Sequence, residues 1–409
     1  MTVMSPEILV GLDIGTTKIC VVVAEVNEGE LNFIGLGTHP SSGLRKGMVI
    51  DVESTVNAIR KAVKEAELMA GCQIDEALIG VAGSHIKCHS SNGVIKINSG
   101  EITEDHVNQV IESASAVAIP QDRIVLETQP QEYIVDDQGG ILDPVGMTGV
   151  RLEVKVNVVT ASKTAVTNLT RCAQKAGLTV IDTILQPLAS SKAVLSQEEC
   201  ELGVALLDIG GGTTDLTIFN QGVISYTSVL PLGGYNMTND IAIGLRTPMR
   251  EAENLKIRYG ACLESLVNKD EYIEVASVGG RKSRRLSRQI LTAILGPRVE
   301  EMLSIINDEI QEQGFKDSLS CGVVLTGGAV LLPGLLEMAD QIFDMPCRIG
   351  IPSGIKGLVD MVSRPEYSTA VGLVMYGYER YLDLYSAEAQ RHGGILKRLS
   401  KIMKNVFGS

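Results

Sequence analysis

Apolar and polar residues follow the same plan at two distant places in the chain. Residues 8–26 carry two apolar runs joined by a Gly-Thr-Thr turn, a pattern that predicts a β-hairpin. Residues 203–230 repeat this plan as an apolar strand, a Gly/Thr turn and two further strands. We interpret the chain as an internal duplication with insertions.

Helical spacing of apolar residues appears between and after these repeats. Residues 51–70 predict a helix that stops at Gly71, and residues 163–176 predict one that stops at Gly177. Residues 179–190 predict a strand, followed by another helix. Residues 235–310 are expected to be mainly helical. A third glycine turn then follows the apolar run near residues 322–329, and a last helix spans roughly residues 368–384.

Residues 84–162 do not follow this alternation of strands and helices. They contain a strand-like stretch, an amphipathic helix from about Thr103 to Ala118, and two long strand-like segments near residues 122–135 and 150–162. We expect a compact α+β subdomain inserted into the first repeat.

Composition narrows the class of protein. The 409 residues suffice for several domains, and the apolar fraction is that of an ordinary soluble chain. A net charge of −13, the absence of Trp and few aromatic residues argue against a nucleic-acid partner. Eight cysteines without a CxxC pair, and no signal peptide or apolar run of membrane-spanning length, favour a cytosolic protein with reduced thiols.

The turns of the two repeats carry chemistry suited to phosphate. Glycine and threonine after a strand let backbone N–H groups approach phosphate oxygens, and an aspartate at the strand end can hold hydrated Mg²⁺. The candidate residues are Asp13, Gly15, Thr16, Thr17 and Lys18 in the first loop and Asp208, Gly210, Gly211, Gly212, Thr213, Thr214 and Asp215 in the second. Facing each other, two such loops would hold one nucleotide between related lobes.

Together with the third turn, at Gly327, Gly328 and Ala329, these loops resemble the actin, sugar kinase and heat-shock chaperone ATPase superfamily. Within it, the chain is similar to the FtsA family of bacterial actin-like cell-division proteins over nearly all of residues 5–409. The stretches that carry this closer resemblance are GLDIGTTK, SHI, GEIT, QPLAS, LDIGGGTTDL, LPLGG, AENLK, VVLTGGA and the C-terminal tail. The resemblance implies an α/β, actin-like (ribonuclease H-like duplicated), two-lobed ATPase fold with the inserted α+β subdomain.

The resemblance also implies a division of labour in an ATP and Mg²⁺ site. The first two loops would hold the β and γ phosphates, with Mg²⁺ held through water by Asp13 and Asp208. Gln186 would orient an attacking water, and Asp208 would assist catalysis. The adenosine side would be formed by Gly234, Glu253, Lys256, Gly327, Gly328 and Ala329, with Glu253 and Lys256 on a helix started by Thr247 and Pro248 and ended by Gly260.

Activity at this site is expected to be weak. The sequence shows no Ser/His/Asp arrangement and no paired carboxylates beyond the Mg²⁺-type aspartates. Positioning and electrostatics alone would support slow phosphoryl transfer. We therefore expect tight ATP binding that acts as an assembly switch, with at most a weak ATPase activity.

A basic segment at residues 278–289 holds five Lys or Arg residues between Arg281 and Arg288. Most such runs are solvated loops. In FtsA proteins this region belongs to the subdomain that receives the C-terminal peptide of FtsZ, the tubulin-like ring protein. The resemblance therefore implies that this peptide is attracted by Arg281, Arg284, Arg285 and Arg288.

The C-terminus predicts an amphipathic helix. Residues 391–409 hold five basic residues and no acidic one. On a helix over residues 395–407, one face would hold Ile395, Leu396, Leu399, Ile402, Met403, Val406 and Phe407, and the other Lys397, Arg398, Lys401 and Lys404. The alternatives are a buried core helix and a helix lying in the interface of an anionic membrane, and the terminal position favours the second.

The resulting hypothesis is a peripheral protein on the cytoplasmic face of the cell membrane at the division site. It would polymerise and tether FtsZ filaments, and later division proteins would contact residues 84–162. The competing hypotheses are a PilM-like pilus assembly protein and a sugar or acid kinase of the same superfamily. The expected parts are residues 1–83, 163–200 and 367–385 for the first lobe, 84–162 for the insertion, 201–234 and 306–366 for the second lobe, 235–305 for a small helical subdomain, 386–394 for a linker and 395–409 for the membrane helix.

Overall fold

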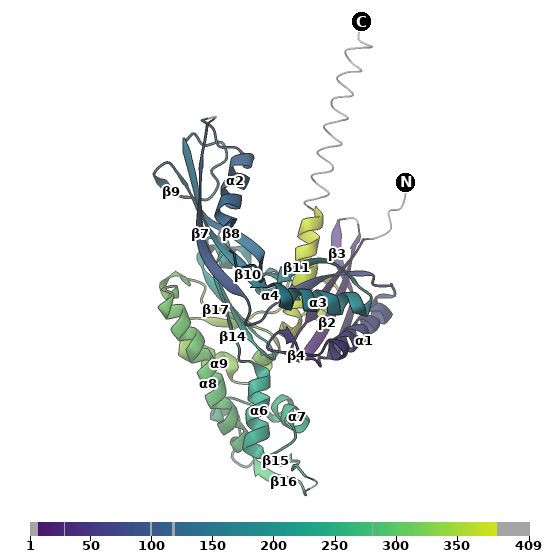
Figure 1. Cartoon of the computed structure of the whole chain (residues 1–409). Coiled ribbons are helices and arrows are strands. Elements are labelled where there is room, and N and C mark those ends of the chain that lie inside the picture. Colours follow the sequence, from purple (N-terminus) through teal and green to yellow (C-terminus); the bar gives the residue numbers. More distant parts are fainter. Residues whose placement is uncertain (1–6, 28, 99, 117–118, 280, 383–409) are drawn as a thin grey trace.

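A computed structural model of the chain describes residues 7–382 except 28, 99, 117–118 and 280. Figure 1 shows two lobes side by side, with the inserted subdomain at one end of the molecule and a mainly helical subdomain at the other. The predicted helix at residues 395–407 lies outside the described residues.

The first lobe is built on a six-stranded sheet with the order β11-β6-β1-β2-β3-β19. β1 (Glu7–Ile14) and β2 (Lys18–Asn27) pair antiparallel, which confirms the hairpin predicted at residues 8–26. The other strands are β3 (Glu30–Pro40), β6 (Glu76–Val81), β11 (Thr179–Leu185) and β19 (Lys356–Gly357). A short hairpin of β4 (Leu44–Arg45) and β5 (Met48–Val49) lies beside it.

Helices cover both faces of this sheet. α1 (Val52–Ala70) and α3 (Lys163–Ala176) pack side by side on one face, and both end at the predicted glycine in a left-handed conformation. The segment 368–382 is helical and covers the other face. A Cβ atom on Gly37 would lie 2.0 Å from the Ala62 carbonyl of α1, and one on Gly11 would lie 2.4 Å from the Ala370 carbonyl. Glycine is therefore needed for both helices to approach the strands.

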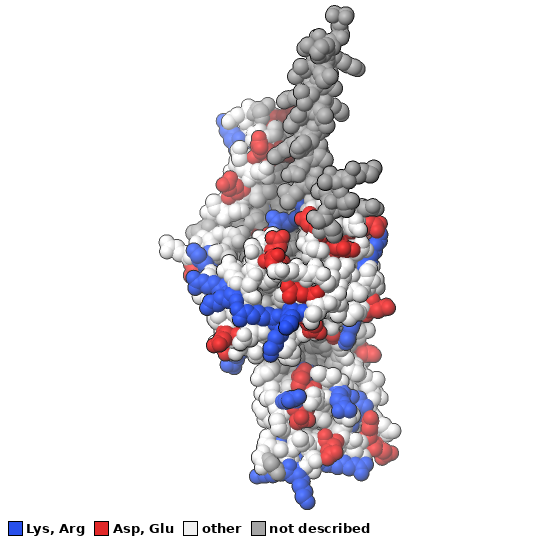
Figure 2. Space-filling model, turned by 90° about the vertical axis from the view of Figure 1, so that its right-hand side faces the viewer, with Lys and Arg blue, Asp and Glu red and all other residues white. Residues whose placement is uncertain are grey.

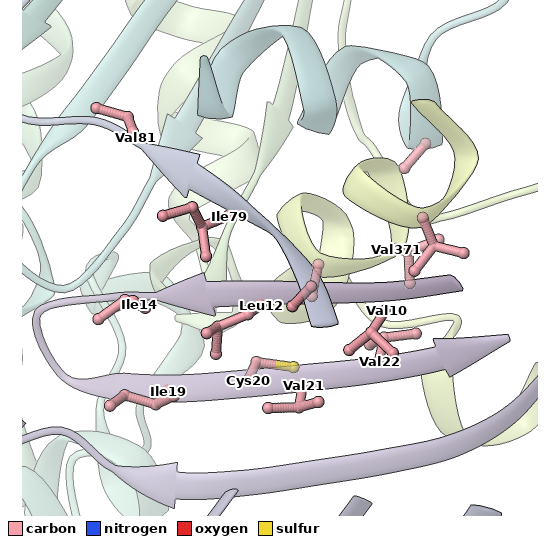
Figure 3. Close-up of a cluster of buried hydrophobic side chains, with 14 of the residues drawn as sticks. Val10, Leu12, Ile14, Ile19, Cys20, Val21, Val22, Ile79, Val81 and Val371 are labelled. Atoms are coloured by element: carbon pink, nitrogen blue, oxygen red, sulfur yellow. The ribbon is translucent and has the colours of Figure 1, made fainter. Parts of the chain in front are cut away.

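The core of this lobe consists of aliphatic side chains from the central strands (Figure 3). Leu12, Ile19, Val21 and Val22 are fully buried or nearly so, and Val371 reaches them from the helical segment 368–382. Continuous apolar runs are typical of strands covered on both faces. The packing fixes the ends of β1 and β2, and therefore the loop between them.

The second lobe repeats the plan with a five-stranded sheet in the order β14-β13-β12-β17-β18. Its strands are β12 (Val204–Ile209), β13 (Thr214–Asn220), β14 (Val223–Leu230), β17 (Val323–Thr326) and β18 (Cys347–Ile349). The strand, turn, strand, strand prediction for residues 203–230 is confirmed. Around the sheet lie α5 (Gln197–Leu202), α9 (Leu335–Phe343) and 3₁₀ turns η2 (Lys316–Ser318), η3 (Gly328–Leu331) and η4 (Pro365–Tyr367). The short α10 (Val359–Val362) lies against β3 of the first lobe, whose core includes Val362.

The inserted segment forms its own four-stranded sheet, β7-β10-β8-β9, with one helix. Its elements are β7 (Lys87–Lys96), α2 (Glu104–Ser115), β8 (Arg123–Val135), β9 (Gln138–Ile141) and β10 (Arg151–Ser162). The helix begins where it was predicted, after Thr103. A separate apolar cluster holds this unit together, as expected for a subdomain.

The segment after β14 is mainly helical, as predicted, but it also contains a small β-ribbon. The helices are α6 (Gly234–Leu245), α7 (Met249–Tyr259) and the long α8 (Arg288–Glu312), with a 3₁₀ turn η1 (Glu264–Leu266). The ribbon pairs β15 (Tyr272–Val275) with β16 (Arg284–Ser287). The basic segment is therefore not a solvated loop throughout, because Arg284–Ser287 form β16, whose Leu286 pairs with the buried Ile273, and Arg288 begins α8.

Candidate nucleotide-binding site

The two DIG loops form the same turn at corresponding places in the two lobes. The Gly15 amide donates to the Lys18 carbonyl (3.0 Å), and the Gly210 amide donates to the Thr213 carbonyl (2.9 Å). In each case the turn joins two antiparallel strands, and the first of these also pairs with a parallel strand, β6 or β17. The internal duplication read from the sequence therefore extends to the backbone of the site.

The loops meet across the gap between the lobes. A Cβ atom on Gly211 would lie 2.3 Å from the hydroxyl of Thr17, and one on Gly212 would lie 2.6 Å from the hydroxyl of Thr16. Threonine on one loop thus faces glycine on the other, so the side chains of the first loop occupy the space that the second leaves open. Any larger side chain at Gly211 would force the loops apart.

A cavity lies between the loops and brings most of the predicted residues together. Its lining includes parts of both lobes, the third glycine turn and the segment before helix 368–382, namely Asp13, Gly15, Thr16, Thr17, Lys18, Gly80, Gln186, Asp208, Gly210, Gly211, Gly212, Thr213, Asp215, Gly327, Gly328, Glu366 and Thr369. Backbone amides, hydroxyls and carboxylates predominate in this lining. This composition suits a polyanion with its counter-ion rather than an apolar ligand.

Asp13 and Asp208, predicted to hold Mg²⁺ through water, each receive hydrogen bonds from neighbouring elements. Gln186 Nε2 donates to Asp13 Oδ1 (2.9 Å). Two hydroxyls bond to Asp208 Oδ2, those of Ser190 (2.7 Å) and Thr369 (3.2 Å). These bonds hold each carboxylate in one orientation and leave its other oxygen for a ligand.

Asp215, at the far end of the second loop, is the most isolated of the three acids. Its Oδ2 accepts from Thr213 (3.2 Å), whereas its Oδ1 is buried without a partner in the described structure. Burial, reinforced by the charges of Asp208 and Asp13, raises the pKa of Asp215 to about 8. Burial likewise raises the pKa of Asp13 to about 7, opposed by the nearby Lys18. Such carboxyls favour the binding of a cation, which stabilises their ionised form.

Lys18 is the one predicted cation of the loops. Its Nζ donates to the Glu366 carbonyl (2.6 Å) and lies over the Tyr367 ring, 4.3 Å from the centroid. The ammonium group is therefore held at the wall of the cavity by residues that come just before helix 368–382. Phosphate oxygens in the cavity would be within the reach of a lysine placed there.

The donor set fits hydrated Mg²⁺ better than a metal held directly by the protein. Within the described residues, no three His, Cys, Asp or Glu side chains converge as direct ligands. Mg²⁺ typically keeps several waters and takes one or two carboxylates together with substrate phosphates. Asp13 and Asp208 would hold such an ion through water, and the unpartnered Oδ1 of Asp215 offers a further acceptor.

The predicted adenosine-side residues form a second group next to this cavity. Lys256 Nζ donates to the Gly234 carbonyl (2.9 Å) and to Thr238 Oγ1 (2.9 Å), and it pairs with Glu253 (2.8 Å). A Cβ atom on Gly234 would lie 3.7 Å from the side chain of Ala329. Gly234, Glu253, Lys256 and Ala329 are therefore neighbours, but they do not line the cavity between the loops, and neither does Thr214.

Two local expectations were wrong. The strand predicted for residues 179–190 ends at Leu185, and Gln186 begins α4 (Gln186–Val194), because Pro187 favours the first turn of a helix. Thr247 does not cap α7, since its buried hydroxyl has no partner in the described structure and Pro248 occupies the cap position. Gln186 nevertheless reaches the site, as does Ser190 one turn later.

Sequence reasoning missed four contributors to the site: Ser190, Thr238, Glu366 and Thr369. They lie outside the three glycine turns, and nothing in their immediate sequence marks them as phosphate or Mg²⁺ contacts. Ser190 and Thr369 are also bonded to each other (3.0 Å). The available signal was modest, namely small hydroxyl residues inside otherwise apolar helices.

The four arginines of the predicted FtsZ-binding segment differ in their surroundings. Arg284 donates to the Leu245 carbonyl, and Arg288 pairs with Glu271 (2.8 Å). Arg285 stacks on Tyr272, with 4.5 Å between its guanidinium and the ring centroid. Arg281 is exposed. Arg284, Arg285 and Arg288 therefore also contribute contacts within the subdomain.

Within the described residues, no helix combines the length and hydropathy needed to cross a membrane.

Family models match two parts of the chain. The model described as cell division protein FtsA matches residues 205–372, and that of the SHS2 domain inserted in FtsA matches residues 83–160, close to the predicted insertion at 84–162. Among solved structures, a PilM–PilN type IV pilus biogenesis complex matches with a TM-score of 0.66 at 17% identity, covering 90% of this chain and 98% of that one. MreB5 of Spiroplasma citri bound to ADP matches with a TM-score of 0.53 at 14% identity, covering 92% and 97%. These likenesses confirm the actin-like fold.

Similarity to curated proteins extends over the whole chain. The cell division protein FtsA of Pseudomonas aeruginosa is 48% identical, with 99% of this chain and all of that protein covered. FtsA of Escherichia coli K12 is 41% identical, with 98% of each chain covered. FtsA of Bacillus subtilis is also 41% identical, over 90% of this chain and 83% of that protein. On these grounds, and with both loops and the inserted subdomain in place, the chain belongs to the FtsA family of cell division proteins.

Proposed function

We propose that this protein binds ATP and Mg²⁺ between its lobes, polymerises, and tethers FtsZ filaments to the cytoplasmic face of the cell membrane through its C-terminal segment. The observation that carries the proposal is the meeting of the two DIG loops at one cavity, with Asp13 and Asp208 each oriented by hydrogen bonds. Family membership supplies the cellular context.

Nucleotide binding is supported by the matching chemistry of the two loops. Backbone amides, threonine hydroxyls and Lys18 would contact phosphate oxygens, while the carboxylates would hold hydrated Mg²⁺, which screens the phosphate charge. MreB5, which shares the fold, has been solved with ADP. The adenosine would extend towards Glu253 and Lys256, which lie beside the cavity.

ATP would act mainly as a switch. Gln186 Nε2 donates to Asp13, and the amide keeps a second N–H and its carbonyl oxygen with which it could position a water. The described lining of the cavity contains no histidine, and its carboxylates are those of Asp13, Asp208, Asp215 and Glu366. We therefore expect slow hydrolysis, and a turnover of many ATP per second by the purified protein would contradict this.

Membrane tethering is supported by the residues after 382. The basic and apolar positions at 395–407 suit a helix in the interface of an anionic bilayer. Four Lys or Arg residues contribute about 1 kcal/mol each near such a surface, partly offset by the ordering of the tail. Polymerisation would present many tails together and raise avidity by orders of magnitude.

The decisive test is co-sedimentation of FtsZ with anionic liposomes. The full chain is compared with a chain that ends at His392, each with and without ATP. We expect only the full chain to carry FtsZ into the pellet, and to do so better with ATP. Equal recruitment by both chains would refute the tether.

FtsZ binding itself is tested with the two arginines that have no backbone or ion-pair contact in the fold. Arg281→Glu with Arg285→Glu should weaken binding of the FtsZ C-terminal peptide and reduce its salt dependence. Lys269→Glu, an exposed change in the same subdomain, is the control. The role of these arginines is excluded if the double variant and the control bind alike.

A further inference from the structure

The outward side of α1 and α3 forms a basic surface on an acidic protein. Residues 1–390 contain 31 basic and 49 acidic residues, so the body of the chain is strongly negative. Figure 2 nevertheless shows Lys and Arg side chains joined in a band across the first lobe. We define the basic face by its six exposed members on the two helices, Arg60, Lys61, Lys64, Lys163, Arg171 and Lys175.

Helical geometry brings these side chains to one surface. The buried residues of α1, such as Ile59, Ala62 and Ala66, face the sheet, and Lys61 and Lys64 lie on the opposite side. α3 has no acidic residue, and its basic residues lie away from its buried positions. The helices are joined by a hydrogen bond from Arg60 Nη2 to the Lys175 carbonyl (2.5 Å).

The charges of the basic face are not neutralised within the fold. None of its six members forms an ion pair with a carboxylate of the described chain. Two of the three carboxylates of α1 are already engaged, because Glu65 accepts from the Thr38 amide and Glu67 from the Ile74 amide. The cationic groups are therefore available to an external anion.

An apolar side chain accompanies them. Leu68 is 77% exposed and follows Lys61 and Lys64 on the same side of α1, at spacings of seven and four residues. An exposed leucine beside lysines suits the boundary of a bilayer, where the ammonium groups meet headgroups and the apolar group meets the acyl region.

We propose that the basic face is the side of the protein that faces the membrane, where it contacts anionic lipid headgroups. This rests on the proposed tethering function, which places the body within reach of a negatively charged leaflet. Within a Debye length of about 10 Å, that leaflet repels an acidic body and attracts a basic face. The body would therefore turn its first lobe towards the bilayer.

The chain is long enough for this arrangement. Helix 368–382 lies on the other face of the sheet from α1. The 12 residues 383–394 precede the predicted membrane helix and can span at most about 40 Å. A sheet with one helix on each face is about 30 Å thick. The reach of residues 383–394 exceeds this thickness, so the predicted membrane helix can lie on the same side as the basic face.

The first experiment measures binding of the full chain to vesicles with and without anionic lipid. The variant Lys61→Gln, Lys64→Gln, Lys175→Gln keeps the tail and the Arg60 hydrogen bond. The control, Lys87→Gln, Lys96→Gln, Lys269→Gln, removes three exposed lysines from other parts of the molecule. We expect at least a tenfold loss of affinity for anionic vesicles, diminishing at high salt, in the first variant alone.

Equal affinities of these two variants would overturn the inference while leaving the tether in place. Failure of the unmodified chain to bind anionic vesicles would overturn both. If the first variant bound vesicles normally but lost an acidic protein partner, the basic face would be a protein-binding surface and the inference would be wrong.

The second experiment reports orientation directly, because the chain contains no Trp. Leu68→Trp places a single tryptophan on the basic face, and Ile243→Trp places one at a 69% exposed position of α6. With vesicles that contain brominated anionic lipid, we expect quenching of the first and not of the second. Stronger quenching at Ile243→Trp, or none at Leu68→Trp while the protein is bound, would contradict a membrane-facing first lobe.

Discussion

The loop at residues 13–18 and the loop at residues 208–215 share a backbone turn but differ in their side chains. The first carries two threonines and a lysine where the second carries two glycines and a threonine, and the second ends in an additional aspartate. Threonine on one side meets glycine on the other. The duplicated loops have thus diverged into complementary halves, and a cleft that closes on a ligand needs both.

The supports of the two aspartates differ as well. Asp13 is held by the single amide of Gln186, whereas Asp208 is held by two hydroxyls from different helical segments. One of these, Thr369, lies in helix 368–382, the last described element before the tail. The second lobe's aspartate is therefore the one bonded to the helix that precedes the proposed membrane-binding segment.

The largest expected effect is the loss of Mg²⁺-dependent ATP binding when either aspartate is replaced. Asp208→Asn should weaken Mg²⁺-dependent ATP binding by about a hundredfold, because a carboxylate that holds a hydrated cation is lost. Asp13→Asn should do the same if the two loops share the ion. Calorimetry with ATP in Mg²⁺ and in chelator tests this, and the variants should match the unmodified chain in chelator. An unchanged affinity in Mg²⁺ would assign the ion elsewhere.

A second effect tests the fit between the loops. Gly211→Ala should destabilise the protein by about 2 kcal/mol, because the new methyl group would overlap Thr17. Adding Thr17→Gly, which removes the Thr17 Cβ that would lie 2.8 Å from the new methyl group, should restore most of the loss. Gly328→Ala is the matched control, since its nearest neighbour would lie 3.7 Å away. Urea unfolding measures the unmodified protein, both single variants at Gly211 and Thr17, the double variant and the Gly328→Ala control. Independent effects of the two substitutions would show that the loops do not touch.

The pH dependence of stability tests the isolated acid of the second loop. Because burial raises the pKa of Asp215 to about 8 from 3.8, the folded protein holds a proton that the unfolded chain has lost. The contribution of this proton to the stability of the fold is complete below pH 3.8 and is lost as the pH rises through about 8.

Asp215→Asn has no such proton to lose. The free energy of unfolding of this variant, relative to that of the unmodified protein, should therefore rise by about 2 kcal/mol between pH 5 and pH 9. This is less than the full pKa shift would give, because the surroundings of a buried charge relax. Chemical denaturation without nucleotide or metal measures this difference. A difference that does not vary with pH would mean that Asp215 is ionised throughout.

The smallest effect concerns the positioning of Asp208. Ser190→Ala removes a 2.7 Å hydrogen bond but leaves the bond from Thr369. We expect about a fivefold loss of Mg²⁺ affinity in the presence of ATP, roughly 1 kcal/mol. Ser191→Ala, which removes a bond to the Leu188 carbonyl instead, should leave Mg²⁺ affinity unchanged. Equal losses in both variants would indicate a general effect on α4.

Much of the site could be predicted because its loops are local. A turn between two paired strands is encoded by adjacent residues, so the sequence alone located Asp13 to Lys18 and Asp208 to Asp215. Gln186 was found through a family resemblance, although the strand predicted to carry it is replaced by a helix after Leu185. Ser190 and Thr369 could not be found in this way, since their role depends on a contact with Asp208 across 18 and 161 residues.

What the sequence by itself determined is the periodic and repeated part of this protein: most of its strands and helices, the duplication and the glycine turns. These follow from steric and hydrophobic patterns over a few residues. The amphipathic helix at residues 395–407 stays a prediction from the same kind of pattern. Only the tertiary structure decided which side chains meet, namely the fit of threonine against glycine, the hydroxyls on Asp208, and the gathering of charges from α1 and α3 on one face. Such contacts arise when the packing of a core fixes distant segments together, and no local pattern specifies them.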